Sequence, residues 1–140
     1  MIYGRDTALA WWPKATPILQ GRASTGIFSF AFIDELNGII VGGDYKADSL
    51  KDRHVFLTHD GGETWSAPAL PTRGYRECVA YLTKKIVIAT GPSGTDISYD
   101  GGNNWSTLSD EKGYHVVRKA RKGKLVIIAG SGGKISVTGL

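Results

Sequence analysis

The chain lacks several features that would point to common protein classes. One cysteine, Cys78, in 140 residues excludes an internal disulfide and a zinc site built from several cysteines. No apolar run reaches about 18 residues and no basic segment precedes an apolar one, so the sequence predicts neither a membrane span nor a signal peptide. Helical periodicity is also missing, because its one candidate, residues 116–124, is β-branched, basic and interrupted by Gly123.

The positive charge of the chain does not by itself indicate a nucleic-acid partner. The formal net charge is +4 and the sequence pI is about 9.2. The lysines and arginines are scattered, apart from five between residues 118 and 124, and no RNA-binding or DNA-binding motif accompanies them. We interpret that cluster as a solvated hairpin tip and expect no nucleic-acid partner. Cys78 lies in an expected strand without an evident base, which favours a buried structural thiol.

Glycine is the residue type that stands out. Hydrophobic residues make up 41% of the chain and charged residues 21%, as in ordinary folded domains. Glycine accounts for 19 of 140 residues, and the glycines stand singly or in pairs between short apolar runs. This spacing predicts many tight turns between short strands, and therefore an all-β fold.

A repeat is visible in the sequence. THDGGETW occupies residues 58–65 and SYDGGNNW occupies residues 98–105, so the two motifs are 40 residues apart. Before each motif the same pieces recur: a glycine, an aromatic-rich strand, a polar turn and an aliphatic strand. These units begin at Gly26, Gly74 and Gly113, and the third lacks the motif. A period of about 40–45 residues built from short strands is typical of a β-propeller blade.

The sequence thus predicts a partial β-propeller with about three blades of four antiparallel strands. We assign all of residues 1–140 to one domain and divide it into 1–20, the end of a preceding blade, the blades 21–70 and 71–110, and an incomplete last blade, 111–140. Residues 7–12 would be the outermost strand of the preceding blade, with Trp11 or Trp12 in the place of the motif tryptophan. About four to eight blades close a ring, so we expect the remaining blades or a second copy of the chain as partners.

The apolar pattern of the strands predicts how the blades stack. Residues 27–32 alternate, which predicts one face with Phe28, Phe30 and Phe32 and another with Ile27, Ser29 and Ala31. The runs IIV, IVIA and LVIIA are continuous, and continuous runs suit strands buried on both faces between adjacent blades.

The two DGG motifs are expected to build turns rather than an active site. A carboxylate in this position accepts backbone N–H bonds across a turn, while glycine adopts the positive φ angles. The following indole would cover the turn, and the preceding hydroxyl would add a hydrogen bond. Catalytic or calcium-binding roles are disfavoured because each carboxylate is occupied by its own turn, and no metal is expected. The structural residues are Thr58, Asp60, Gly62 and Trp65, and Ser98, Asp100, Gly102 and Trp105.

These motifs carry a resemblance to known families. The pattern S/T-x-D-x-G-x-x-W resembles the Asp-box, or bacterial neuraminidase repeat. The segments GIFSFAFIDELNGIIVGGDY and GYRECVAYL resemble bacterial proteins similar to the plant photosystem II stability and assembly factor, over nearly the whole chain from about residue 16. The resemblance implies a propeller, and an extracytoplasmic parent protein because related chains are typically exported. It does not fix a function, since sialidases, glucan hydrolases, sorting receptors and assembly factors share the Asp-box.

The candidate ligand site follows from the expected ring. The innermost strands of a propeller line its channel, so residues that begin these strands should gather at one mouth. A polar binding surface for a protein or glycan is expected there. Its strand residues are Thr25, Phe28, Tyr75, Arg76, Tyr114 and His115, and its rim residues are Asp44, Tyr45 and Asp96. Alternatively, Arg76 pairs with an acid of a neighbouring blade such as Glu77 or Asp44, and the tyrosines only pack.

Three functional classes remain open at the level of sequence. A non-catalytic binding or assembly scaffold is favoured because every strong pattern is architectural. A sialidase-like glycoside hydrolase fragment is the alternative; Tyr75, Arg76 and Asp96 would supply part of its site, but the F/Y-R-I-P signature is absent. An oxidoreductase, the label that relatives often bear, is third. The chain has no glycine-rich phosphate loop and no cofactor-linking cysteine motif, so we expect no cofactor.

Overall fold

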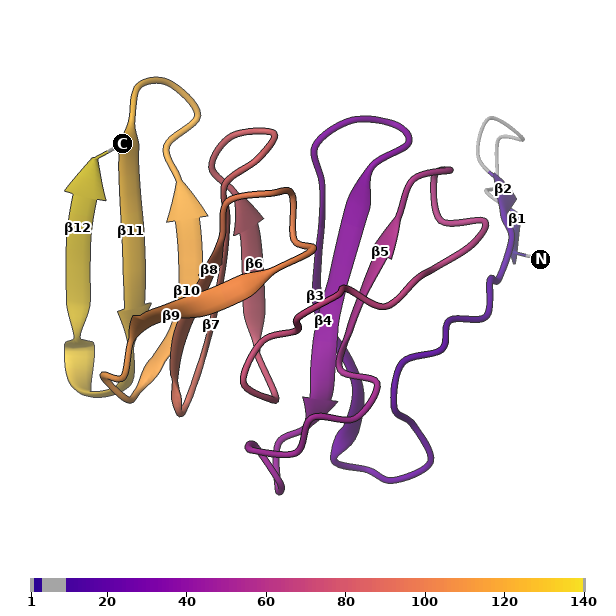
Figure 1. Cartoon of the computed structure of the whole chain (residues 1–140), viewed down its shortest axis with the longest axis horizontal. Helices are drawn as coiled ribbons and strands as arrows, with labels where there is room; N and C mark the ends of the chain where they lie inside the picture. The colour runs from indigo at the N-terminus through magenta and orange to yellow at the C-terminus, as the bar shows by residue number, and fades with distance from the viewer. Residues whose placement is uncertain (1, 4–9, 140) are drawn as a thin grey trace.

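The fold of the chain is described by a computed structural model, which covers residues 2–3 and 10–139. In this range the regular secondary structure consists of strands and one 3₁₀ turn, η1 (Ser131–Gly133), joined by turns and irregular segments. The sheets stand side by side, from the N-terminus at one end to the C-terminus at the other (Figure 1). No helix in the described range is long and apolar enough to cross a membrane.

Four antiparallel sheets follow one another along the chain. The first is a small pair, β1 (Ile2–Tyr3) with β2 (Ala10–Trp11), and residues 7–9 of the strand expected over 7–12 lie outside the described range. The three larger sheets keep the order of the sequence. They contain β3 (Thr25–Phe32), β4 (Gly38–Asp44) and β5 (Val55–Thr58); β6 (Cys78–Tyr81), β7 (Val87–Gly91), β8 (Gly94–Ser98) and β9 (Trp105–Ser109); and β10 (Tyr114–Lys119), β11 (Leu125–Gly130) and β12 (Ile135–Gly139).

The second of these larger sheets alone has a complete fourth strand within the described residues. In the first, the fourth position is reduced to a bridge in which Leu57 and Ser66 exchange two backbone hydrogen bonds of 2.8 Å. Pro68 and Pro71 follow this bridge closely, and a proline cannot donate to a strand ladder, so the pairing stops there. The chain is an all-β protein whose antiparallel sheets of three or four strands have the architecture of a partial β-propeller.

The hydrophobic core lies between the sheets rather than within any one of them. Ile39 and Val41 of β4 pack against Val87 and Ala89 of β7, with Trp105 completing this cluster. A second cluster joins the next two sheets and contains Cys78, Leu82, Ile88, Ile97, Val117 and Val126. The central strand β7 therefore presents alternate residues to opposite neighbours. The run IIV of β4 and the part of IVIA that lies in β7 are buried as the sequence predicted, because both faces of these strands are covered. In LVIIA of β11 only Val126 is buried, so the expectation is not met there.

The expected face of three phenylalanines on β3 is wrong. Ile27 pairs with Gly42 and Ser29 pairs with Val41, so a β-bulge makes Phe28 the extra residue. Phe28 meets the ring of Tyr75, at the second larger sheet, with 5.1 Å between ring centroids. Phe32 instead packs on Trp65, on the opposite side of the first larger sheet. One inserted residue is enough to move a side chain to the other face of a strand, and strict alternation in the sequence did not reveal it.

The first DGG turn is closed by its own side chains. Asp60 Oδ1 accepts the Thr58 hydroxyl and the Thr64 backbone N–H, each at 2.9 Å, and its Oδ2 accepts the Thr64 hydroxyl at 2.6 Å. The Gly62 N–H donates to the Thr58 hydroxyl at 2.8 Å, and φ of Gly62 is 90°. The hydrogen bonds to the Asp60 carboxylate, that of the Thr64 hydroxyl first, lower the pKa of Asp60 from 3.8 to about 2.

The second turn repeats this arrangement with different donors. Asp100 accepts the Ser98 hydroxyl and the Asn104 backbone N–H at 2.8 Å, and the Asn104 side-chain amide at 2.7 Å. Gly102 N–H donates to the Ser98 hydroxyl at 2.9 Å. The indole N–H of Trp105 donates to the Gly102 carbonyl at 2.7 Å, which fastens the ring over the turn. Both carboxylates are thus engaged in local turns about one sheet apart.

We predict that Asp60→Ala lowers the melting temperature by roughly a few degrees near pH 7, because the turn loses its acceptor. The folded pKa of Asp60, about 2, lies below its ordinary 3.8, so the fold favours the ionised form above pH 3.8. That stabilisation is lost as the pH falls through the folded pKa. The difference in melting temperature between wild type and variant should therefore narrow from about pH 4 to about pH 2.

Thermal melts followed by circular dichroism would measure this difference, with Glu35→Ala on another exposed turn as the control. A melting temperature that Asp60→Ala leaves unchanged at neutral pH would show that the carboxylate is dispensable for the turn.

Candidate functional site

The residues expected at the ring mouth differ sharply in exposure. The exposed members are Phe28 and Tyr45, with 40% and 48% of their surface accessible, and His115 and Thr25 are half-buried. The other five are buried, with exposed fractions of 6% or less: Asp44, Tyr75, Arg76, Asp96 and Tyr114. A ligand on the surface therefore reaches the first group directly, whereas the second group makes contacts inside the protein.

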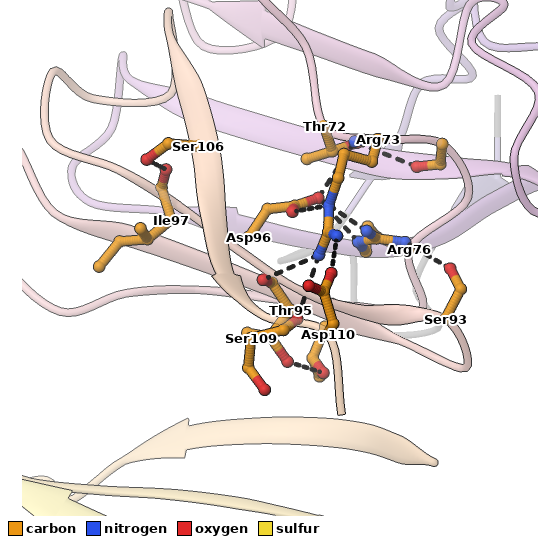
Figure 2. Close-up of polar contacts among 12 residues, drawn as sticks. Thr72, Arg73, Arg76, Ser93, Thr95, Asp96, Ile97, Ser106, Ser109 and Asp110 are labelled. Atoms are coloured by element: carbon orange, nitrogen blue, oxygen red, sulfur yellow. Dashed lines mark hydrogen bonds and ion pairs between the residues drawn. The ribbon is translucent and has the colours of Figure 1, made fainter. Parts of the chain in front are cut away.

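Arg76 forms a buried ion pair with Asp96 (Figure 2). Its Nε donates to Asp96 Oδ2 at 3.0 Å, and its Nη2 lies 2.8 Å from the same oxygen without hydrogen-bond geometry. Nη1 donates to the Tyr75 carbonyl at 2.7 Å and to the Ser93 hydroxyl at 3.1 Å. Burial lowers the pKa of Arg76 while Asp96 opposes that shift. The acid is on β8 of the sheet that Arg76 precedes, so the pairing expected with Glu77 or Asp44 across blades is wrong.

Arg73 completes this cluster, and the sequence analysis missed it. Its Nε donates to Asp96 Oδ1 at 2.7 Å and its backbone N–H donates to Oδ2 at 3.1 Å. Its Nη2 donates to the Ser109 carbonyl at 3.1 Å, and Nη1 contacts Asp110, as Figure 2 shows. The side chain ties residues 71–76 to β8 and β9. The spacing Arg73-x-x-Arg76 was the available signal, but nothing in it identifies an acid 20 residues further on.

Asp44 and Tyr114 also have structural partners. Asp44 accepts the Lys46 backbone N–H at 2.9 Å, and its pKa is lowered, mostly by a hydrogen bond from Ser24. The Tyr114 hydroxyl lies 2.5 Å from the Ser136 hydroxyl, and Lys134 Nζ stands 5.0 Å from the centre of the Tyr114 ring. Each residue thus fixes a connection between neighbouring segments.

Three aromatic rings meet where the first two larger sheets adjoin. Phe28 and Tyr75, Phe28 and Tyr45, and Tyr45 and Tyr75 have centroid separations of 5.1, 6.0 and 6.4 Å, all edge to face. Burial, with smaller contributions from Glu77 and Tyr45, raises the pKa of Tyr75 well above its ordinary value, so the phenol is neutral. The buried Tyr75 ring supports the exposed Phe28 and Tyr45 rings from below. We call these three residues the aromatic patch.

A second polar group lies at the junction of the last two sheets. His115 Nδ1 is 2.6 Å from Glu77 Oε1, and His115 Nε2 is 2.9 Å from Ser131 Oγ. His115 was expected at the mouth, but Glu77 was considered only as a partner of Arg76 and Ser131 was not considered. The side chains come from residues 38 and 16 positions away from His115, so no local motif signals the contact.

Comparisons with known proteins place the fold but not the family. No protein-family model matches the chain. No curated protein matches it. Among solved structures, YCF48 bound to D1 peptide is similar to this chain with a TM-score of 0.63 and 21% sequence identity, over 89% of this chain and 44% of that chain. The chain therefore spans less than half the length of that structure. A likeness at this identity shows the fold alone, and it supports a propeller-like architecture.

Proposed function

We propose that the chain is part of a propeller scaffold that binds a protein partner through an extended peptide segment at the mouth of the ring. The observation that carries the proposal is the aromatic patch. Exposed aromatic side chains supply large contact areas at low conformational-entropy cost, and they are frequent at the energetic centres of interfaces. The similarity to a structure of YCF48 bound to D1 peptide adds support for a peptide as the ligand.

The surroundings of the patch suit a peptide backbone as well as apolar side chains. Tyr45 immediately follows β4, and Phe28 sits in the bulge of β3, the edge strand of its sheet. An edge strand has backbone groups without a partner within its sheet, and these are the groups an extended peptide uses. Aromatic faces also stack on sugar rings, so a glycan is the other outcome that the binding experiment can show.

We predict that Tyr45→Ala weakens peptide binding about tenfold or more, because it removes the more exposed of the two accessible rings of the patch. Peptides would be selected from a random phage-displayed library on the full chain. Their dissociation constants would then be measured by fluorescence anisotropy with wild-type and variant protein.

Tyr99→Ala is the matched control, because Tyr99 is 62% exposed and lies at the second DGG turn. Selected peptides that bind Tyr45→Ala as tightly as wild type, or a selection that enriches no peptide, would contradict the proposal. If the chain binds sugars on a glycan array in a way that requires Tyr45, and binds no peptide, the ligand of the patch is a glycan.

The two ends of the stack bear apolar faces that a further sheet would cover. On the last sheet, β11 residue Ile127 pairs with Val137 of β12, and Ala129 pairs with Ile135, so these four share a face. Ile135 and Val137 are 60% and 58% exposed. On the first larger sheet, Phe30 pairs with Ile40 and is 68% exposed. In the first and second larger sheets, the face that corresponds to this one is buried against the next sheet along the chain. We infer that another sheet of this kind covers each end, either from a longer chain or from a second copy.

The purified 140-residue chain is therefore expected to self-associate at micromolar concentration. Light scattering coupled to size exclusion would measure its mass, and Val137→Lys should reduce the associated fraction because it places a charge in the apolar face. A chain that stays a soluble, stable monomer at high concentration would contradict the inference that another sheet covers these faces, whether it comes from a longer chain or from a second copy.

A further inference from the structure

The group Glu77, His115 and Ser131 has the connectivity of a serine nucleophile with its base. Glu77 precedes β6, His115 is the second residue of β10, and Ser131 opens η1. The carboxylate contacts Nδ1 of the imidazole and the serine hydroxyl contacts Nε2, at 2.6 Å and 2.9 Å. An acid on one ring nitrogen and a hydroxyl on the other is the order found in serine hydrolases on several unrelated folds.

An ionised Glu77 and a neutral His115 set the direction of both hydrogen bonds. An ionised carboxylate only accepts hydrogen bonds. Nδ1 of His115 is therefore protonated and donates to Glu77. In the neutral imidazole, Nε2 is then the acceptor, and the Ser131 hydroxyl donates to it. The serine proton therefore points at a base that is free to take it.

The surrounding backbone holds the hydroxyl in place. Ser131 N–H donates to the Gly113 carbonyl at 2.8 Å, and the Lys134 N–H donates to the Ser131 carbonyl at 3.2 Å. Glu77 N–H donates to the Thr90 carbonyl at 2.9 Å, which ties the acid to β7. Ser131 is exposed, and the side chains of His115 and Glu77 are 35% and 28% exposed, so the group is both positioned and reachable.

The backbone N–H groups of Gly132 and Gly133 are the candidate donors for a developing negative charge. Gly132 and Gly133 follow it with φ angles of 68° and 73°, and successive N–H groups in such turns form a concave site for anions. A Cβ added to either glycine would meet nothing within 4 Å, so the space beside them is open. The nearby Lys134 ammonium is held by the Lys112 carbonyl at 2.8 Å and by Glu111 at 3.1 Å, so it is not counted among these donors.

From this geometry we propose that Ser131, His115 and Glu77 form a hydrolytic site for carboxylic esters, distinct from the aromatic patch. Ser131 Oγ attacks the ester carbonyl carbon while its proton passes to His115 Nε2. The carbon–oxygen bond to the alcohol then breaks, and the alkoxide leaves with that proton as an alcohol. Water attacks the acyl-serine, gives its proton to Nε2, and the acid departs as Ser131 Oγ regains a proton. Water is the one co-reactant.

The solvent exposure of the site determines which substrates it can hydrolyse. Water has access to the developing oxyanion, which weakens its stabilisation relative to a closed pocket. Alkoxide leaving groups need less help than amines, so small acyl esters are the expected substrates rather than amides. An acetyl ester that projects from a larger molecule could reach Ser131 without entering a cavity.

Two probes of the full chain test the proposal. The first is 4-nitrophenyl acetate, for which we expect a burst of one nitrophenolate per chain. The second is diisopropyl fluorophosphate, which should add to Ser131 as identified by intact mass and peptide mapping. Ser131→Ala should abolish the labelling, and His115→Ala should slow it about 10²-fold or more. Ser49→Ala, which removes an exposed serine of another loop, should change neither reaction.

Glu77 is a positioning residue, and its effect should be separable from folding. Glu77→Gln should lower the inactivation rate constant for the fluorophosphate about tenfold, while the half-saturating concentration and melting temperature stay unchanged. Glu77→Asp should restore part of the rate. Failure of the folded wild-type chain to label at Ser131 would overturn the proposal. Labelling that His115→Ala leaves undiminished, or acetate release that Ser131→Ala leaves intact, would do the same. None of these outcomes bears on peptide binding at Tyr45.

Discussion

Asp96→Ala is expected to lower the free energy of unfolding by about 3–5 kcal/mol, the loss typical of breaking a buried ion pair from one side. The substitution leaves the Arg76 guanidinium, which is 1% exposed, without its acid in the interior. Arg73 loses the same carboxylate, so the segment before β6 loses two charge-assisted connections to β8. Urea denaturation followed by tryptophan fluorescence would measure the change.

Asp110→Ala serves as the matched control for this result. Asp110 also contacts Arg73, but its side chain is 82% exposed, so the loss should be about 0–1 kcal/mol. The double variant Arg76→Met with Asp96→Leu should lose less than Asp96→Ala, since no charge remains unpaired in the interior. Equal effects of Asp96→Ala and Asp110→Ala would contradict the assignment of Asp96 as the centre of the cluster.

Trp105→Ala is expected to lower the free energy of unfolding by about 3–5 kcal/mol, the range for deleting a buried aromatic ring. Trp105 is 4% exposed and belongs to the cluster between the first two larger sheets. Its indole N–H also donates to the Gly102 carbonyl of the preceding turn. The loss would therefore include packing between sheets and the cover of the turn.

The matched variant is Trp65→Ala, at the same position of the first motif. Trp65 is half-buried, and its buried Nε1 has no hydrogen-bond partner among the described residues. Both changes would be measured by chemical denaturation, and Trp65→Ala should be the milder by about 1 kcal/mol or more. The opposite ranking would mean that the face beside Trp65 is more thoroughly covered in solution than in the structure.

The sequence did not separate the exposed from the buried members of the candidate surface. Tyr45 and His115 were expected at the mouth and are accessible, whereas Arg76 and Asp96 were expected there and are buried. A polar residue at the start of an inner strand points to the ring mouth or into the sheet according to a register that one bulge can shift. The expected ligand residues therefore remain a proposal that the binding experiment must test.

What the sequence determined by itself is the local architecture. The DGG motifs predicted two tight turns, and each turn is closed by hydrogen bonds spanning at most four residues. Two of the three continuous apolar runs, those of β4 and β7, are covered on both faces as predicted. Short-range contacts of this kind follow from neighbouring residue types, so they can be inferred without knowledge of the fold.

Only the tertiary structure decided which distant side chains meet. Asp96 receives Arg73 and Arg76 from 23 and 20 residues away, and His115 meets Glu77 from 38 residues away. These contacts depend on how the strands and the segments between them pack together. Such packing is settled by the fit of whole sheets, for which no short stretch of sequence carries the information.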